Sequence, residues 1–335
     1  MAGIATARTI DIHAHAVLAD TMGAAGRFGP EMGMDAEGKP WFRVGDYKLL
    51  GVKYKGSPFM DVDLRIQRMD EAGIDFQVLS PNPLTYFHFI DAKEAVAFCA
   101  KHNDALAALV KRYPDRLAGF CALPIQEPSA AVEELHRSVK ELGLWGPYIG
   151  ADSPRRVEST DFDPLYAACV QLDVPLFIHP SVAGLDGPPG DPNLKGFDLD
   201  LAVGFAASET LAVARIIFGG VLERHPKLDI CISHGGGAVA YLAGRLGQAG
   251  MMRPWAPAWT KKDGAFEEIL KRFWYDAHVH DPRALKMLTD IVGKDRLVFG
   301  TNFAGWDQPP HIEPSPQAKE MADNARRLLR ADKKK

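Results

Sequence analysis

Eight short apolar runs, separated by longer stretches with helical periodicity, constrain the fold of this chain more than any other feature. The runs cover residues 9–13, 76–79, 117–122, 145–149, 174–178, 228–232, 273–277 and 297–300. Strands that alternate with helices in this way indicate βα units around a parallel sheet. Eight such units in a chain of 335 residues predict an α/β fold, a closed (β/α)8 TIM barrel that forms a single domain over residues 1–335.

A doubly wound open sheet is the alternative arrangement of the same units. It is disfavoured because no GxGxxG follows the first run and the chain contains no Walker loop. Residues 16–60, rich in glycine and proline, separate the first strand from the first helix, expected at Asp61. A loop of that length in a compact domain is usually functional or disordered. Because it follows a strand, we expect a small insertion over the barrel mouth, with a second irregular segment at 181–200 on the same side.

Bulk properties exclude several classes of partner. A formal charge of −4 and an isoelectric point near 6.3 give no basic surface for nucleic acid. The longest apolar region, 201–222, is interrupted by Glu209 and Arg215, and the N-terminal apolar stretch is too short for a signal peptide, so no membrane association is expected. Four cysteines without paired spacing are typical of reduced thiols in a cytoplasmic protein.

Histidines follow three of the expected strands. His13 and His15, in DIHAH, share one strand face because side chains alternate with a period of two. His179 and His234 each come directly after an apolar run. The carboxyl ends of barrel strands meet at one rim, and clustered neutral imidazoles suit a divalent metal ion. Each histidine alone could be a hydrogen-bonded core residue, but the joint arrangement favours a site.

A second HxH, His278 and His280, follows the seventh run. Here a structural interpretation leads, because Asp281 and Pro282 resemble the N-cap and first position of a helix. We assign no site role to these two histidines from the sequence.

These motifs together resemble those of the amidohydrolase superfamily. HxH follows the first strand, HP the fifth, HGGG the sixth and GT with a carboxamide the eighth; RIQRMDEAGIDFQVLS, FGGVLERHPKLDICISHGGGA and DRLVFGT carry further similarity. The branch that the chain resembles most includes 2-amino-3-carboxymuconate-6-semialdehyde decarboxylase and γ-resorcylate decarboxylase. The resemblance extends from Ile10 to about Asn302.

The resemblance implies a metal centre. It assigns one divalent ion, zinc first and manganese second, to His13, His15 and His179, with Asn302 at the remaining ligand position. His234 would be the acid or base. The fourth strand segment, WGPYIGAD, lacks the lysine that bridges two metals in binuclear members, so one metal is expected.

The resemblance also implies substrate contacts. Arg245 and Arg253, in a GR…MRP pattern, would bind a substrate carboxylate, one of them in the neighbouring subunit of a homodimer. Taken from the sequence alone, each arginine could equally be a solvated charge on a helix. The arginine that the decarboxylase branch carries before the first helix is absent, and Lys55 or Lys53 could supply a positive charge there.

Asn302 departs from the branch, in which an aspartate takes this position. Three explanations stay open. The amide oxygen could ligate the metal or bind its water, the residue could be an introduced Asp→Asn change, or the proton transfer could pass to His234 with Asp307 as a further candidate.

The expected function is a metal-dependent decarboxylase of a hydroxylated aromatic or muconate-type carboxylic acid. The arguments are that a metal polarises a substrate oxygen and that a histidine delivers a proton to carbon. The alternative on the same scaffold is a hydrolase or hydratase of a ring-cleavage product or lactone. A third hypothesis is a non-catalytic barrel, since fold does not imply function.

Overall fold

All eight expected strands are present and parallel. The computed structural model describes residues 2–153, 155–181, 191–308 and 316–333. The barrel strands are β1 (Ile10–Ala16), β5 (Phe76–Pro81), β6 (Leu117–Gly119), β7 (Tyr148–Gly150), β8 (Leu176–His179), β9 (Ile230–Ile232), β10 (Trp274–Asp276) and β11 (Leu297–Val298).

The strands close into a ring. One sheet has the order β1-β5-β6 and the other β11-β10-β9-β8-β7. A parallel bridge between Cys121 and Pro147 joins β6 to β7. On the opposite side, the Ile12 amide donates to the Phe299 carbonyl at 3.0 Å, which joins β1 to β11. The predicted barrel is therefore confirmed, and the open sheet is excluded.

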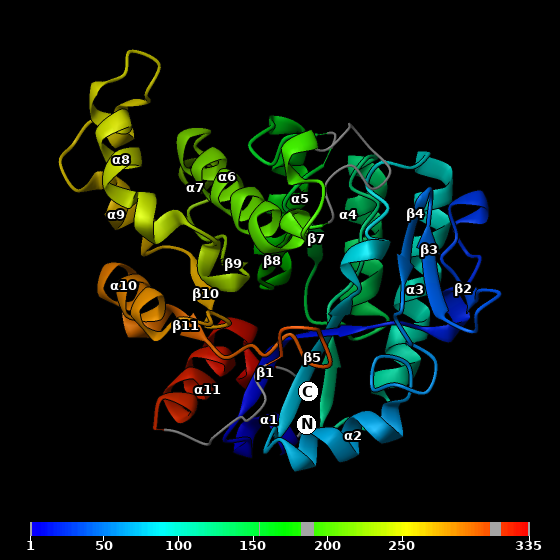
Figure 1. Ribbon diagram of the computed structural model, residues 1–335. Helices are drawn as coiled ribbons and strands as arrows, with labels where there is room; N and C mark the ends of the chain where they lie inside the picture. Colours follow the sequence, from blue (N-terminus) through cyan, green and yellow to red (C-terminus); the bar gives the residue numbers. More distant parts are fainter. Residues whose placement is uncertain (1, 154, 182–190, 309–315, 334–335) are drawn as a thin grey trace.

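Helices follow the barrel strands and cover them from outside (Figure 1). Those at the expected positions have the expected starts: Asp61 caps α2, and Asp281 caps α10, with Pro282 at its first position. The helices are α1 (Ala2–Thr6), α2 (Val62–Glu71), α3 (Ala92–Val110), α4 (Pro128–Lys140), α5 (Asp163–Leu172), α6 (Phe205–Phe218), α7 (Val221–Arg224), α8 (Val239–Met252), α9 (Ala265–Leu270), α10 (Pro282–Val292) and α11 (Pro316–Leu329).

The barrel interior is a packed apolar core that supports the site from below. Val78, Phe177 and Trp274 belong to one buried cluster, which also includes residues of α1 and α11 at the amino end of the strands. Neighbouring strand positions such as Ile178 belong to a second cluster, between the strands and the surrounding helices. The alternation continues to the strand ends, so that His179, two residues after Phe177, faces the barrel mouth.

The segment after β1 contains a small sheet of its own. Strands β2 (Glu31–Met34), β3 (Pro40–Val44) and β4 (Tyr47–Leu50) pair antiparallel in that order. The sheet lies beside α3 (Figure 1) and contributes Phe42 to a buried cluster with Tyr54 and Phe98. The sequence pattern predicted an insertion here but no sheet. Of the second irregular segment, 182–190 lies outside the described residues.

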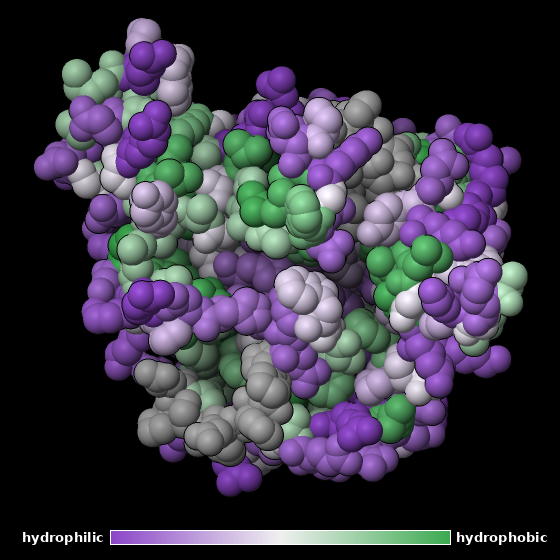
Figure 2. All heavy atoms as spheres, viewed as in Figure 1, coloured by the Kyte–Doolittle hydropathy of each residue, from purple (hydrophilic) through white to green (hydrophobic). Residues whose placement is uncertain are grey.

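One helical stretch, 200–218, is by length and composition apolar enough to cross a membrane. It consists of a π-helical turn, Asp200–Gly204, followed by α6. In this fold it packs against α8 and the turn after β9. Apolar side chains gather over α6 on the face shown in Figure 2. Val203 in the π-helical turn and Leu211 in α6 are exposed. Its one acidic residue within α6, Glu209, is fully buried.

Candidate metal centre and active site

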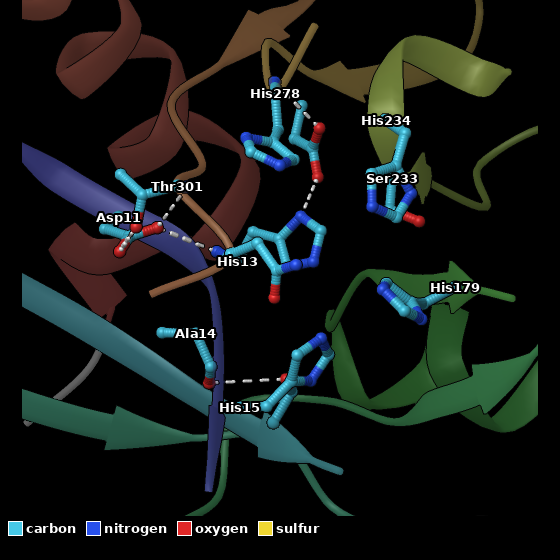
Figure 3. A network of polar contacts seen from close by, with 12 residues as sticks. Asp11, His13, Ala14, His15, His179, Ser233, His234, His278 and Thr301 are labelled. Atoms are coloured by element: carbon cyan, nitrogen blue, oxygen red, sulfur yellow. Dashed lines mark hydrogen bonds and ion pairs between the residues drawn. The ribbon is translucent and has the colours of Figure 1, made fainter. Parts of the chain in front are cut away.

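Three buried histidines meet at the barrel mouth. His13 and His15 come from β1 and His179 from the end of β8, and one nitrogen of each lies within 4.8 Å of the others. Their ring centroids are 4.7 to 5.1 Å apart. Figure 3 shows the three rings converging from two strands, two from β1 and one from β8. The structure thus brings together the three histidines that the sequence analysis expected as ligands.

The hydrogen bonds of these rings leave one nitrogen of each available. Every Nδ1 has a partner oxygen: the Asp276 carboxylate for His13, the Pro81 carbonyl for His15 and the Pro180 carbonyl for His179, at 2.8, 2.9 and 2.6 Å. The Nε2 atoms of His13 and His15 are buried and have no hydrogen-bond partner within the described residues. An imidazole that donates through one nitrogen and leaves the other bare is arranged as a metal ligand. The donor set therefore fits a divalent ion.

Burial keeps the triad neutral. It lowers the pKa of His15 to about 3 and holds the pKa values of His13 and His179 well below that of an ordinary histidine. Neutral imidazoles are the form that binds metal, so no proton has to be displaced at neutral pH.

His234 differs from the triad in its charge. It follows β9, and its ring centroid lies 4.8 Å from that of His13. Its Nδ1 bonds to the carboxylate of Glu209 at 2.8 Å, and Ser233 also donates to that carboxylate. Burial lowers the pKa of His234, but the Glu209 charge and hydrogen bond outweigh it and raise this pKa to about 9. A protonated imidazole therefore lies beside a neutral triad.

The carboxamide of Asn302 lies at the edge of the same site. Its Nδ2 donates to Asp307 at 2.5 Å. The preceding Thr301 is held by Asp11, which accepts from the Thr301 hydroxyl at 2.7 Å and from the His13 amide at 3.0 Å. Asp11 therefore couples the ends of β1 and β11.

His278 lies closer to the site than the sequence analysis assumed. It is buried, its ring centroid is 5.4 Å from that of His13, and its Nε2 bonds to Asp307 at 3.0 Å. His280 is exposed and reaches the same carboxylate at 3.3 Å. Together with His234, His278 and Asp307 form a second group of potential ligands.

A cavity of about 370 Å³ opens over the triad, large enough for one small aromatic acid. His15, His179 and Asn302 line it, and the insertion contributes Tyr47, Leu49, Val52, Lys53, Tyr54, Ser57, Pro58 and Phe59. The lining is mostly apolar, and Lys53 is the one lysine or arginine among the described lining residues.

The expected carboxylate-binding residues do not reach this cavity within one subunit. Lys55 is exposed and lies outside the cavity lining, whereas Lys53, two residues earlier, lines it. Arg245 and Arg253 are exposed on and directly after α8, which stands out from the barrel (Figure 1). Neither guanidinium has an ion-pair or hydrogen-bond partner among the residues that the structure describes.

Two residues that support the site were not assigned by the sequence analysis. Asp276 bonds to the Nδ1 of His13. The sequence feature that could have indicated it is an acidic residue at the end of an apolar run, two positions before His278. Glu209 holds His234, and its signal was a single carboxylate within an apolar helical stretch. A carboxylate in such surroundings is almost never fully buried without a partner.

The family model described as Amidohydrolase matches residues 10–334. The chain belongs to the amidohydrolase family. This confirms the resemblance read from the strand-end motifs.

Several relatives of this amidohydrolase are decarboxylases. The 2-amino-3-carboxymuconate-6-semialdehyde decarboxylase of Dictyostelium discoideum is 33% identical over 245 residues, 72% of this chain and 66% of that protein, slightly less than two thirds of its length. The γ-resorcylate decarboxylase of Rhizobium radiobacter is 28% identical over 81% of this chain and 87% of its own. A 2-keto-4-carboxy-3-hexenedioate hydratase of Sphingobium sp. is 29% identical, with coverages of 72% and 69%.

Solved structures agree with the fold. Metarhizium anisopliae IDCase superposes with a TM-score of 0.84 at 23% identity, over 99% of this chain and all of that one. The 5-carboxyvanillate decarboxylase of Novosphingobium aromaticivorans, solved with manganese and 4-hydroxy-3-methoxy-5-nitrobenzoic acid, has a TM-score of 0.70 at 27% identity, with coverages of 82% and 81%. The triad and this neighbour together support a single divalent metal ion in the amidohydrolase described here.

Proposed function

We propose that this protein is a metal-dependent decarboxylase that acts on a hydroxylated aromatic or muconate-type carboxylic acid. The observation that carries the proposal is a buried triad of histidines that lies at an apolar cavity and has His234, held by Glu209, beside it. Loss of CO2 from such an acid requires a proton delivered to carbon and a polarised oxygen next to the departing carboxylate.

Metal binding and proton delivery would fall to different residues. When bound by His13, His15 and His179, the metal ion would supply a Lewis acid that polarises a substrate oxygen. His234 would deliver the proton through Nε2, since its Nδ1 is held by Glu209. Three imidazole nitrogens favour zinc, while manganese is the ion in the carboxyvanillate decarboxylase structure. We propose zinc for this chain, to be checked by elemental analysis of the protein as purified.

The substrate carboxylate needs a cation. Lys53 lines the cavity and provides one from within the subunit. The second would be Arg245 or Arg253 of a partner copy in a homodimer. Support comes from α8 and the turn after it, which expose Tyr241, Met252 and Trp255 beside these unpartnered arginines. This surface, residues 241–255, is called the α8 arm below.

The expected location is the cytoplasm. All four cysteines are free and buried, which suits a reducing compartment.

The deciding experiment measures CO2 release. Protein stripped with a chelator and reloaded with Zn2+ or Mn2+ is incubated with hydroxylated benzoates and with muconate-type acids. We expect CO2 release only from the reloaded protein, and solvent deuterium on the product carbon. If neither metal restores CO2 release and no such acid or nitro analogue binds, the proposal is wrong. Protein that also retains no metal would favour the non-catalytic barrel.

A hydratase or hydrolase is the second candidate. The observation that favours it is the similarity to the Sphingobium hydratase, at an identity close to that of the γ-resorcylate decarboxylase. The same site would then direct water to carbon, with His234 managing the proton. Turnover in ¹⁸O-labelled water separates the two, because hydration or hydrolysis places the label in the product and decarboxylation does not.

A further inference from the structure

We propose that Asp307 is a positioning residue that orients the carboxamide of Asn302, so that the amide oxygen faces the histidine triad. The inference rests on the proposed function, because the triad is taken as the metal centre. It assigns Asn302 the role of a neutral oxygen donor whose direction is set by a neighbouring carboxylate.

The hydrogen bond identifies which end of the carboxamide faces Asp307. Carboxylate oxygens only accept, so the amide atom 2.5 Å from Asp307 Oδ1 is the nitrogen Nδ2. The oxygen of a planar carboxamide lies on the other side of Cγ from the nitrogen and therefore points away from Asp307. Asn302 lines the cavity together with His15 and His179, and this is the space that the oxygen is left to face.

The backbone of Asn302 is already held in place. Its φ of 49° lies in the left-handed region, which asparagine tolerates better than most residues. On one side Thr301 is anchored to Asp11, and on the other the Phe303 amide donates to the His13 carbonyl at 3.3 Å. The side-chain torsions therefore remain to be set, and the bond to Asp307 sets them.

Asp307 is itself restrained from the other side. Its Oδ2 bonds to His278 at 3.0 Å and to His280 at 3.3 Å, which leaves Oδ1 for Asn302. A competing interpretation is a second metal site made of His234, His278 and Asp307. The bond between His278 Nε2 and the carboxylate accounts for this group without an ion, and the Zn2+ stoichiometry distinguishes the two interpretations.

A reciprocal exchange tests the proposal. Zn2+ affinity is measured by competition with a chelator for wild type, Asn302→Asp, Asp307→Asn and the double variant, with kcat and Tm alongside. In the wild-type background, Asp307→Asn should weaken Zn2+ binding by about ten- to a hundredfold. The new carboxamide at position 307 can turn either its nitrogen or its oxygen toward Asn302, so it no longer fixes which end of Asn302 faces the metal. In the Asn302→Asp background the same change should instead tighten Zn2+ binding. There it removes the repulsion between two facing carboxylates and gives the new carboxylate at position 302 an N–H donor.

The reversal of sign is the decisive result. Equal effects of Asp307→Asn in both backgrounds would overturn the proposal, as would a wild-type stoichiometry of two Zn2+ ions that falls to one in Asp307→Asn. Asp307→Glu, which keeps the charge but displaces it by one methylene, provides a second variant if Asp307→Asn does not fold, and should also weaken binding. Asp290→Asn, which removes an exposed carboxylate on α10, serves as the matched control and should change nothing.

Failure of the proposed function would look different. Wild-type protein that binds Zn2+ no better than His15→Ala would exclude the triad as the metal centre. If wild type binds Zn2+ tightly but Asp307→Asn has the same effect in both backgrounds, only the orientation of Asn302 by Asp307 is excluded.

Discussion

The four histidines of the cluster differ in the direction of their pKa shifts, which burial, hydrogen-bond partners and neighbouring charges set together. The Nδ1 of His15 and that of His179 each face a neutral carbonyl, so burial dominates and both rings stay neutral. His234 faces the buried carboxylate of Glu209 and keeps its proton. His13 also has a carboxylate neighbour, Asp276, yet burial and the neighbouring imidazoles keep its pKa low.

The first prediction concerns Glu209. Glu209→Gln preserves the shape but removes the charge that raises the pKa of His234, while the burial that lowers it remains. The pKa of His234 should fall, so its protonated fraction near pH 8 decreases and the basic limb of the kcat profile moves to lower pH. We expect kcat at pH 8 to drop by about tenfold or more, with metal content unchanged. Glu223→Gln, at an exposed glutamate, is the control; an unaltered pH profile in Glu209→Gln would contradict the assignment.

At the scale of elements, the periodicity of the sequence predicted the strands and helices. It could not predict which side chains from distant segments contact each other. The strands, the α2 and α10 caps and the rim histidines follow from spacing. The sheet β2-β3-β4 was missed because its strands are only four or five residues long and lie in a segment rich in turns. Phe42 is buried in a cluster with Tyr54 and Phe98, which lie outside these strands. Asp276 and Glu209 were visible as acids in apolar runs, yet their partners lie on other strands. The role of His278 was missed because Asp307 approaches from a separate loop.

The insertion should control substrate affinity more than chemistry. Phe42→Ala opens a cavity in the core of the insertion and should destabilise it by about 3–5 kcal/mol. Because eight residues of the insertion, between Tyr47 and Phe59, line the cavity while the histidines belong to the barrel, we expect KM to rise more than kcat falls. Phe162→Ala, at an equally buried phenylalanine before α5, is the comparison. It should lower Tm without raising KM.

The end of α11 gives a prediction on acid stability. Hydrogen bonds from Lys333 and Arg330 hold the pKa of Asp173 below its usual range, against a smaller effect of burial. A lowered pKa adds stability above the ordinary value and loses it as pH falls through the folded value. Asp173→Asn should therefore lower the stability by less than about 1 kcal/mol at pH 7. In thermal melts the difference should shrink as the pH falls below the ordinary Asp value of about 3.9. A difference that stays constant as the pH falls further would contradict the ion pairs.

At the scale of the whole molecule, the proposed homodimer makes the α8 arm of one subunit part of its partner's site. If a partner arginine completes the site, His234→Asn and Arg253→Ala should each be inactive alone. When the two variants are dissociated, mixed and reassociated, the mixture should regain about a quarter of wild-type activity. Half of the dimers then contain one copy of each variant, and one of the two sites in such a dimer is intact. The same mixture made with Arg245→Ala identifies which arginine acts. No recovery with either, together with a monomer in analytical ultracentrifugation, would exclude the shared site.

The closure of β1 against β11 also has a consequence for biosynthesis. His13 leaves the ribosome near the start of translation, His179 near the middle and Asn302 near the end, and the strand that carries His13 completes the ring only by pairing with Phe299. A nascent chain therefore cannot assemble the full ligand set until almost all of it has been made. With the ligands proposed above, we expect metal uptake in the cell to be a late event that follows closure of the barrel, and chains truncated before β11 to lack the complete ligand set.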